Sequence, residues 1–262
     1  MTHNSPPSAL VTGANRGLGL ELVRQLLTLP QPPKLVFATC RNPNGPQAQS
    51  LQELAEKEPN LRILRLDVTD PTSIQLAETQ VRNYLSGEGL ALLVNNAGIL
   101  IPSSLHEEKA SSMHLSYQTN VVGPLLLGQV FGSLLKKAAS IHSKKELSWA
   151  RAAIINMGSA AGSLTELLGW EYGQATSYRC SKVNRAALNM LTRCQGLTYA
   201  KEGILCAGIH PGWVKTDMSS ISEYTPMLTV TESIQGVLKV MAQLTEKEAG
   251  AFLDWEGHVV PW

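Results

Sequence analysis

Seven short apolar runs recur along the chain, and segments with helical periodicity lie between them. The centres of these runs are nearly continuously apolar, as in strands that are buried on both faces. Strands that alternate with helices form a parallel sheet covered on both sides. The sequence therefore predicts an α/β fold. The runs span Ser8–Gly13, Lys34–Cys40, Leu61–Val68, Leu90–Gly98, Arg151–Ser159, Gly203–Gly212 and Ala251–Trp255.

Two helix starts can be placed from capping patterns. Asp70 precedes Pro71, which is a residue typical of the first helical position. Thr229 and Glu232 have the spacing of a capping box. No repeat or linker divides the 262 residues, which are enough for one large core. We therefore predict one domain over residues 1–262.

Composition limits the partners. The formal net charge is +1, so neither nucleic acid nor an anionic membrane is expected as a partner. The four cysteines are scattered, and the six histidines show no metal-ligand spacing. We expect no metal site. The first residues lack a secretory signal and no apolar run is long enough to cross a bilayer, so the cytosol is the expected compartment.

A glycine-rich loop follows the first predicted strand directly. Gly13, Gly17 and Gly19 stand in the stretch TGANRGLG, which also opens the first helix. Glycines let a backbone turn tightly against a pyrophosphate, and helix N–H groups then bind that anion. A simple glycine turn is the alternative, but the position after the first strand favours a dinucleotide site.

Two arginines favour NADPH over NADH. NAD enzymes usually place an acidic residue at the end of the second strand, whereas this strand ends in ATCRN. Arg41 stands at that end, and Arg16 lies within the glycine loop. Two guanidinium groups suit a 2′-phosphate, and they disfavour an NAD-linked alcohol oxidation. Asp67 either faces the adenine or caps its own turn; the residues leave these alternatives equal.

The chain has three side chains that suit the reduction of a carbonyl group: a serine, a tyrosine and a lysine. Ser159 follows the fifth strand, and Tyr178 and Lys182 lie four residues apart on the next helix. A tyrosine can protonate a newly formed alkoxide, and a nearby ammonium lowers the high pKa of its phenol. Ser159 can hydrogen-bond the carbonyl oxygen. The alternative is that the tyrosine and the lysine simply lie on one exposed face of a helix and have no catalytic role.

Asn120 adds a fourth candidate. Pro124 stands four residues later and cannot donate to the Asn120 carbonyl. That carbonyl could instead hold a water that relays protons to Lys182. A simple helix kink is the alternative.

Together, TGANRGLG, NNAG at Asn95–Gly98, Asn120, Ser159 and YRCSK resemble the classical short-chain dehydrogenases/reductases. Finer stretches such as TNVVGPLLL and HPGWVKTDM are similar to the sniffer-like and C-factor-like carbonyl reductases. The resemblance implies a doubly wound Rossmann fold with a seven-stranded parallel sheet flanked by helices on both faces, and a substrate loop near 213–228. It implies the catalytic set Asn120, Ser159, Tyr178 and Lys182. The implied cofactor-binding set is Gly13, Asn15, Arg16, Gly17, Leu18, Gly19, Arg41, Asp67, Val68, Asn95, Ala97, Gly98, Tyr178, Lys182, Pro211, Gly212, Val214 and Thr216.

The expected activity is NADPH-dependent reduction of a ketone, quinone or aldehyde, with Tyr178 as proton donor. The alternative is an NADPH-binding sensor or interaction protein with little turnover. The substrate is not predicted. Trp213, Tyr224 and Met227 either line its pocket or pack the loop, and His210 is read as structural. The family pairs helices into dimers, but a polar insertion before the fifth strand leaves a homodimer open.

Overall fold

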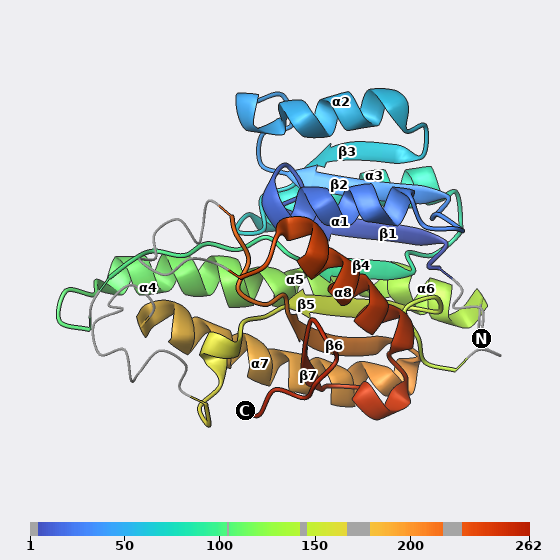
Figure 1. The fold of residues 1–262 in the computed structure, drawn as a ribbon. Helices are drawn as coiled ribbons and strands as arrows, with labels where there is room; N and C mark the ends of the chain where they lie inside the picture. The colour runs from blue at the N-terminus through green and yellow to red at the C-terminus, as the bar shows by residue number, and fades with distance from the viewer. Residues whose placement is uncertain (1–4, 104, 142–145, 167–178, 217–226) are drawn as a thin grey trace.

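The computed structural model describes residues 5–103, 105–141, 146–166, 179–216 and 227–262. Within these residues, seven strands form one sheet in the order β3-β2-β1-β4-β5-β6-β7 (Figure 1). Every neighbouring pair is parallel, which confirms the predicted sheet. The strands are β1 (Ser8–Thr12), β2 (Leu35–Cys40), β3 (Leu61–Arg65), β4 (Leu92–Asn95), β5 (Ala153–Met157), β6 (Leu205–His210) and β7 (Phe252–Asp254).

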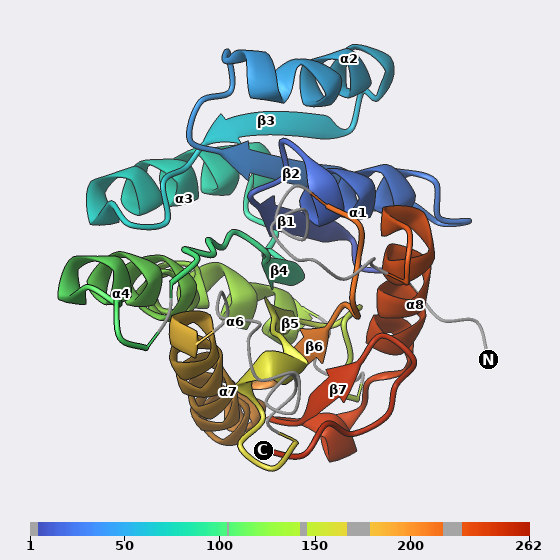
Figure 2. The same ribbon diagram turned by 60° about the vertical axis from the view of Figure 1, so that its left-hand side comes forward.

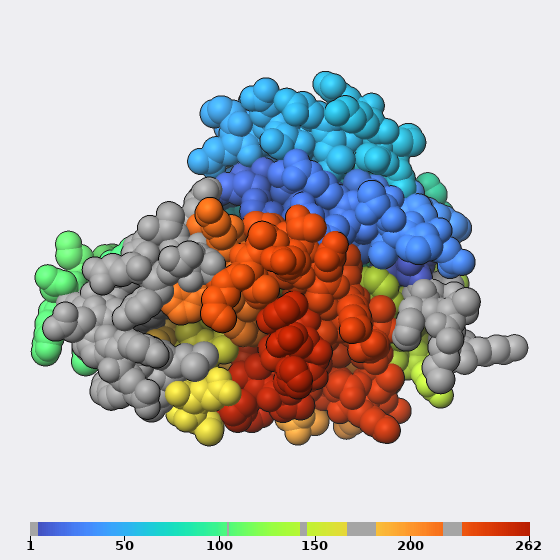
Figure 3. All heavy atoms as spheres, in the orientation of Figure 1, coloured from blue at the N-terminus to red at the C-terminus, as the bar shows by residue number. Residues whose placement is uncertain are grey.

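Helices cover both faces of the sheet (Figure 2). Helices α1 and α8 lie side by side on one face, and they form a continuous surface in the space-filling view (Figure 3). Helices α3, α5 and α6 cover the other face, where α7 packs against β6. None of the helices in the described ranges has the length and apolar character needed to span a membrane. The helices are α1 (Gly17–Leu27), α2 (Gln49–Lys57), α3 (Pro71–Leu85), α4 (Ala110–Tyr117), α5 (Gly123–Val130), α6 (Gly132–Ile141), α7 (Arg179–Tyr199) and α8 (Val230–Gln243).

The pleat of each strand divides the core into two layers. In β1, Ala9 and Val11 pack under α1 and α8, whereas Leu10 packs under α3, α5 and α6. Successive side chains of a strand point to opposite faces. The strands are therefore apolar on both sides, which is why the sequence shows continuous rather than alternating apolar runs.

Both predicted helix starts are confirmed. The Asp70 side chain accepts a hydrogen bond from the Thr72 N–H at 2.9 Å, and Pro71 is the first residue of α3. At α8, the Glu232 N–H donates to the Thr229 hydroxyl at 3.2 Å, and the Thr229 N–H donates to the Glu232 carboxylate at 2.9 Å. These bonds satisfy N–H groups that have no partner within the helix.

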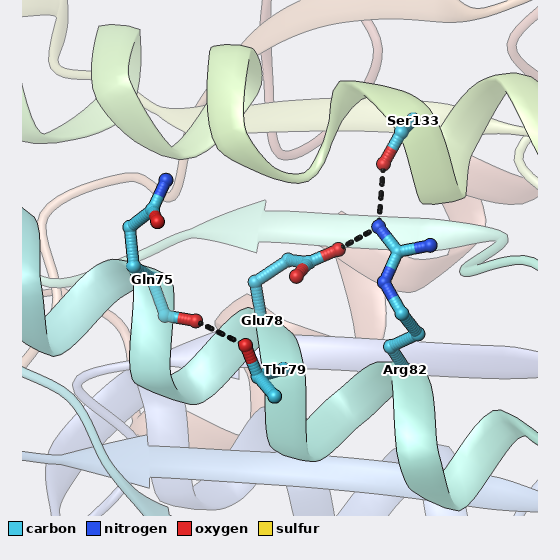
Figure 4. A network of polar contacts seen from close by, with 5 residues as sticks. All are labelled: Gln75, Glu78, Thr79, Arg82 and Ser133. Carbon is cyan, nitrogen blue, oxygen red and sulfur yellow. Dashed lines mark hydrogen bonds and ion pairs between the residues drawn. The ribbon is translucent and has the colours of Figure 1, made fainter.

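Polar contacts join two helices on the α3 side of the sheet (Figure 4). Glu78 and Arg82 form an ion pair one turn apart on α3. Arg82 also donates to the Ser133 hydroxyl on α6 at 2.9 Å. Half-exposed ion pairs contribute little to stability. The contact therefore links α3 to α6 and adds little to the free energy of unfolding.

Candidate active site

The sheet has its topological switch point between β1 and β4, because the strand order reverses there. Ligands of open α/β sheets bind at the carboxyl ends of the strands beside such a point. Gly13 follows β1, the NNAG stretch ends β4, and Ser159 follows β5. The predicted site segments therefore share one edge of the sheet.

The glycine loop has the geometry of a phosphate cradle. Gly13 and Gly17 have φ values of 63° and 56°, in the left-handed region that favours glycine. A Cβ on Gly19 would lie 2.4 Å from the Gly13 carbonyl oxygen. The N-cap of α1 is Arg16, whose side chain makes no capping bond. The first N–H groups of α1 have no acceptor from that cap, so the loop fits a pyrophosphate.

Asn96 joins this loop to the end of β4, and sequence analysis did not single it out. Its side-chain amide donates to the carbonyls of Thr12 and Gly13 at 2.8 and 3.1 Å. The N–H groups of Asn96 and Ala97 both donate to the Thr12 hydroxyl at 3.0 Å. The second asparagine of NNAG thus fixes the cradle against β4.

Asn95, by contrast, directs its side chain into the protein. It is buried and donates to the Asn156 side chain on β5 at 2.8 Å. Asn156 in turn donates to Thr192 and Gln195 of α7, both at 2.8 Å. The side chain of Asn95 therefore belongs to an internal network, and only its backbone is left for a cofactor contact.

The two predicted 2′-phosphate ligands lie in one corner of the molecule. The loop that carries Arg16 joins the end of β2 through an Ala14 N–H bond to the Thr39 carbonyl at 3.0 Å. Arg41 follows β2 directly, and both arginines are exposed. The two arginines thus follow the ends of the neighbouring strands β1 and β2, and their contact with a 2′-phosphate stays a prediction.

Asp67 caps its own turn, as one of its two predicted roles requires. One carboxylate oxygen accepts from the N–H and the hydroxyl of Thr69 at 2.9 and 2.7 Å. Contact with adenine stays a prediction for the second oxygen. Val68 is buried beside it and touches the backbone at Gly123.

Ser159 occupies the turn after β5. Its hydroxyl accepts from the Ala161 N–H at 3.2 Å and so caps a short 3₁₀ helix at Ala160–Gly162. A hydroxyl that accepts one bond keeps its own hydrogen to donate. Capping and hydrogen bonding to a substrate oxygen are therefore compatible at this residue.

Asn120 lies in a π-helical turn at Gln118–Val122, just before Pro124. The turn is closed by the Gly123 N–H, which donates to the Gln118 carbonyl. The buried Asn120 amide bonds both the N–H and the carbonyl of Ile99, at 2.9 and 3.0 Å. A helix irregularity at this point is thus observed, whereas the proton-relay role of the Asn120 carbonyl stays a prediction.

Helix α7 brings a cation to this edge. Tyr178 lies outside the described residues, and Lys182 is partly buried near the start of α7. Arg185, one turn further on, donates to the Met157 carbonyl at 2.9 Å. Arg185 was not among the residues predicted from the sequence, although its spacing of three from Lys182 places the two on adjoining parts of one face.

The first residues of the loop after β6 approach the glycine loop at Thr216. Gly212 has a φ of 83°, and a Cβ there would lie 2.5 Å from the Leu228 side chain. Val214 pairs with Leu228 as an isolated bridge, which joins the two ends of the predicted substrate loop. A Cβ on Gly17 would lie 4.0 Å from the Thr216 methyl group. Thr216 therefore lies near the glycine loop, and cofactor contacts of Pro211, Gly212, Val214 and Thr216 stay a prediction.

Three residues of this loop are candidates for lining the substrate pocket, and the structure describes two of them. Trp213 is 43% exposed and Met227 is 86% exposed. Of the two roles predicted for Met227, packing the loop onto the body of the protein is therefore not observed, and lining the substrate pocket stays a prediction. Tyr224 lies outside the described residues.

Three potential metal ligands lie at the end of β7 and just after it, with their ligand atoms within 4.8 Å of one another: Asp254, Glu256 and His258. One oxygen of the Asp254 carboxylate accepts from the N–H groups of Glu256 and His258 at 2.9 and 2.8 Å. The other oxygen lies 3.1 Å from the His258 ring. These contacts are those of a side chain that closes a turn.

Comparisons with known proteins agree with this geometry. The sequence profile of the short chain dehydrogenase family matches residues 7–225. The NADPH-bound carbonyl reductase from chicken fatty liver is 51% identical, with a TM-score of 0.91 over 99% of this chain and 100% of that one. The carbonyl reductase Sniffer of Drosophila melanogaster is 34% identical, with a TM-score of 0.91 over 98% and 100%. An uncharacterized oxidoreductase of Schizosaccharomyces pombe is 30% identical over 96% of each chain. The chain therefore belongs to the short-chain dehydrogenase family.

Proposed function

We propose that this protein reduces a carbonyl compound to an alcohol with NADPH. The observation that carries the proposal is the shared edge of the sheet, where the glycine loop, Asn120, Ser159 and the start of α7 meet. The likeness to the NADPH-bound carbonyl reductase of chicken, at 51% identity, supports both the reaction and the cofactor.

Different residues would bind the different parts of NADPH. Gly13, Gly17 and Gly19 would hold the pyrophosphate at the start of α1. Arg16 and Arg41 would bind the 2′-phosphate. Asp67 and Val68 would border the adenine, and Thr216 the nicotinamide amide. When bound, the cofactor supplies the hydride for the carbonyl carbon.

The protein's own residues supply the proton and orient the substrate. Tyr178 donates a proton to the oxygen that becomes the alcohol. The Lys182 ammonium favours the phenolate form and lowers the pKa of that phenol. Ser159 donates a hydrogen bond to the same oxygen as charge develops on it. The bonds of Asn120 to Ile99 hold the adjoining backbone in place.

The arginine corner gives an expected cofactor preference. Each charge-assisted hydrogen bond to the 2′-phosphate contributes about 1.5–3 kcal/mol, so NADPH should bind more than ~10-fold more tightly than NADH. Arg41→Asp should abolish or reverse this preference, because it places a carboxylate where NAD enzymes carry one. Dissociation constants for both cofactors, measured by fluorescence titration, check this.

The fold should be unaffected in that variant, because Arg41 is exposed. Lys34→Asp, at an exposed lysine just before β2, is the matched charge control and should keep the wild-type preference. Equal affinities of the wild-type protein for NADPH and NADH would contradict the assignment of Arg16 and Arg41.

The reaction itself is tested by NADPH consumption with a panel of quinones, diketones and aldehydes. Reduction of at least one compound class is expected, together with formation of the matching alcohol. An NADPH-binding sensor would bind the cofactor and consume none of it with any of these compounds. An intact set of Asn120, Ser159, Tyr178 and Lys182 in the sequence favours the enzyme.

The exposed surface of α7 suits binding to a second copy of the chain. Val183, Met190 and Leu197 recur every seven residues on this helix and are 54–64% exposed. Such spacing forms one apolar stripe along a helix, and apolar stripes at the surface mark interaction sites. A homodimer is therefore expected in analytical ultracentrifugation, and Met190→Glu should convert it to a monomer. A wild-type monomer at micromolar concentration would contradict this pairing.

A further inference from the structure

The guanidinium of Arg185 lies where the carboxyl ends of β4 and β5 meet. Its Nη1 donates to the carbonyl of Met157, the last residue of β5, at 2.9 Å. Its Nη2 is 3.4 Å from the point that a Cβ on Gly98 would occupy. The Oδ1 atom of Asn120 is 3.2 Å from the same point. Arg185 therefore adjoins two residues of the proposed site.

The backbone of Arg185 also packs closely against a neighbouring segment. A Cβ on Gly162 would lie 2.6 Å from the Arg185 carbonyl carbon and 2.8 Å from the Ala186 nitrogen. Gly162 ends the short helix that Ser159 caps. Helix α7 therefore packs directly on the turn that presents Ser159, and this contact sets where the guanidinium lies.

The charge of Arg185 has no counter-ion in the described part of the chain. The Met157 carbonyl is the single acceptor its guanidinium contacts there, and no carboxylate lies within ion-pair distance. Burial lowers the pKa of Arg185 to about 10, which leaves it charged at neutral pH. A guanidinium has five N–H donors. Arg185 is partly buried, and its other donors face the site, where an anion would complete their hydrogen bonds.

Neighbouring groups do not provide that anion. The Asn120 amide is already bonded to Ile99 at both of its ends. Burial lowers the pKa of His210 to about 4, and the charge of Arg185 acts in the same direction, so His210 is neutral at pH 7. The Asp254 carboxylate is engaged by the N–H groups of Glu256 and His258 and by the His258 ring.

We propose that Arg185 binds a carboxylate of the substrate, and that the substrates include 2-oxo acids. The proposal rests on the carbonyl reduction proposed above. A guanidinium and a carboxylate match as two parallel hydrogen bonds. The phosphates of the cofactor are assigned to the ends of β1 and β2, so they do not account for a cation beside β4 and β5.

A 2-oxo acid carries both of the groups that Arg185 and Ser159 would bind. Its carboxylate and its reactive carbonyl are on adjacent carbons, and Ser159 stands two residues after Met157, which Arg185 contacts. The carbonyl carbon accepts the hydride, its oxygen accepts the proton, and the carboxylate is unchanged. The product is then the corresponding 2-hydroxy acid.

Benzoylformate and its methyl ester test this, because adding one methyl group removes the negative charge and leaves the reactive carbonyl in place. The wild-type enzyme should reduce the acid with a kcat/KM at least ~10-fold above that of the ester, the scale of one charge-assisted hydrogen bond. Arg185→Met should lower the value for the acid by at least ~10-fold and leave that for the ester within about twofold. Arg185→Lys should restore part of the preference, because it keeps the charge and loses the forked geometry. Arg193→Met, at an exposed residue of the same helix, should change neither.

Binding provides a measurement that does not depend on turnover. Calorimetry with mandelate and methyl mandelate, on the enzyme saturated with NADP⁺, should show an Arg185-dependent preference for the acid. Equal kcat/KM for acid and ester in the wild-type protein, or an equal loss of both in Arg185→Met, would overturn the proposal and leave Arg185 as a support of the β5 turn. If mandelate binds as expected but no carbonyl is reduced, the anion site stands and the proposed reaction is wrong.

Discussion

Tyr178→Phe is expected to lower the turnover of carbonyl substrates by at least ~10²-fold, the usual effect of losing a positioned general acid. The substitution keeps the ring and removes only the hydroxyl that we propose as the proton donor. NADPH affinity should stay close to that of the wild-type protein, because the pyrophosphate and the 2′-phosphate are assigned to the glycine loop and to Arg16 and Arg41. Steady-state kinetics and a cofactor titration on the same preparation separate the two effects.

Lys182→Ala is the companion variant, and it should affect both quantities. In the proposed mechanism the ammonium favours the phenolate of Tyr178, so its removal should raise the pKa of that phenol. In the pH–rate profile of any residual activity, the limb that reports the tyrosine should therefore lie at a higher pH than in the wild-type enzyme. NADPH should also bind more weakly, because the resemblance assigns Lys182 to the cofactor. Native turnover in Tyr178→Phe would reject the mechanism and favour the NADPH sensor.

Gly19→Ala is expected to abolish most cofactor binding. The added Cβ would lie 2.4 Å from both the Gly13 carbonyl oxygen and the Asn96 side-chain nitrogen. The backbone oxygen cannot yield without a shift of the glycine loop, so NADPH affinity should fall by at least ~10-fold, with about 1–3 kcal/mol lost from the free energy of unfolding. A cofactor titration and a urea unfolding curve measure these changes.

Gly132→Ala is the matched control for that substitution. Gly132 begins α6, and an added Cβ there meets no atom within 4 Å. Alanine is also the better helix former. This variant should keep wild-type NADPH affinity and equal or slightly greater stability. A Gly19→Ala protein that binds NADPH like the control would show that the loop does not hold the pyrophosphate.

The sheet was predictable from the sequence, but the strand ends were not. The third apolar run was expected to continue to Val68, whereas β3 ends at Arg65. Arg65 pairs with Cys40, the last residue of β2. A strand ends where its neighbour can no longer supply hydrogen bonds, and a neighbour's length cannot be read from the strand's own residues.

The site segments were predictable because they follow strands directly, but individual side-chain directions depend on packing. Asn95 shares the pleat direction of Leu93, which packs under α5 and α6, and so it points into the interior. Strand periodicity alone could have indicated this. Asn96 follows the strand, and its direction depends on the contact with Gly13.

Arg185 could not have been placed from sequence. Its position follows from the packing of α7 on Gly162, which joins segments far apart in the chain. The spacing from Lys182 shows a shared helix face, but it does not show which part of that face meets β4 and β5.

The most direct test of the account is the fate of the transferred hydrogen. NADPH carrying deuterium at the transferred position of its nicotinamide is incubated with the enzyme and a carbonyl compound that the panel has identified. The alcohol product, analysed by mass spectrometry and NMR, should carry one deuterium on the carbon that bore the carbonyl group. Binding of NADPH without any labelled alcohol, from any compound of the panel, would contradict carbonyl reduction as the function of this protein.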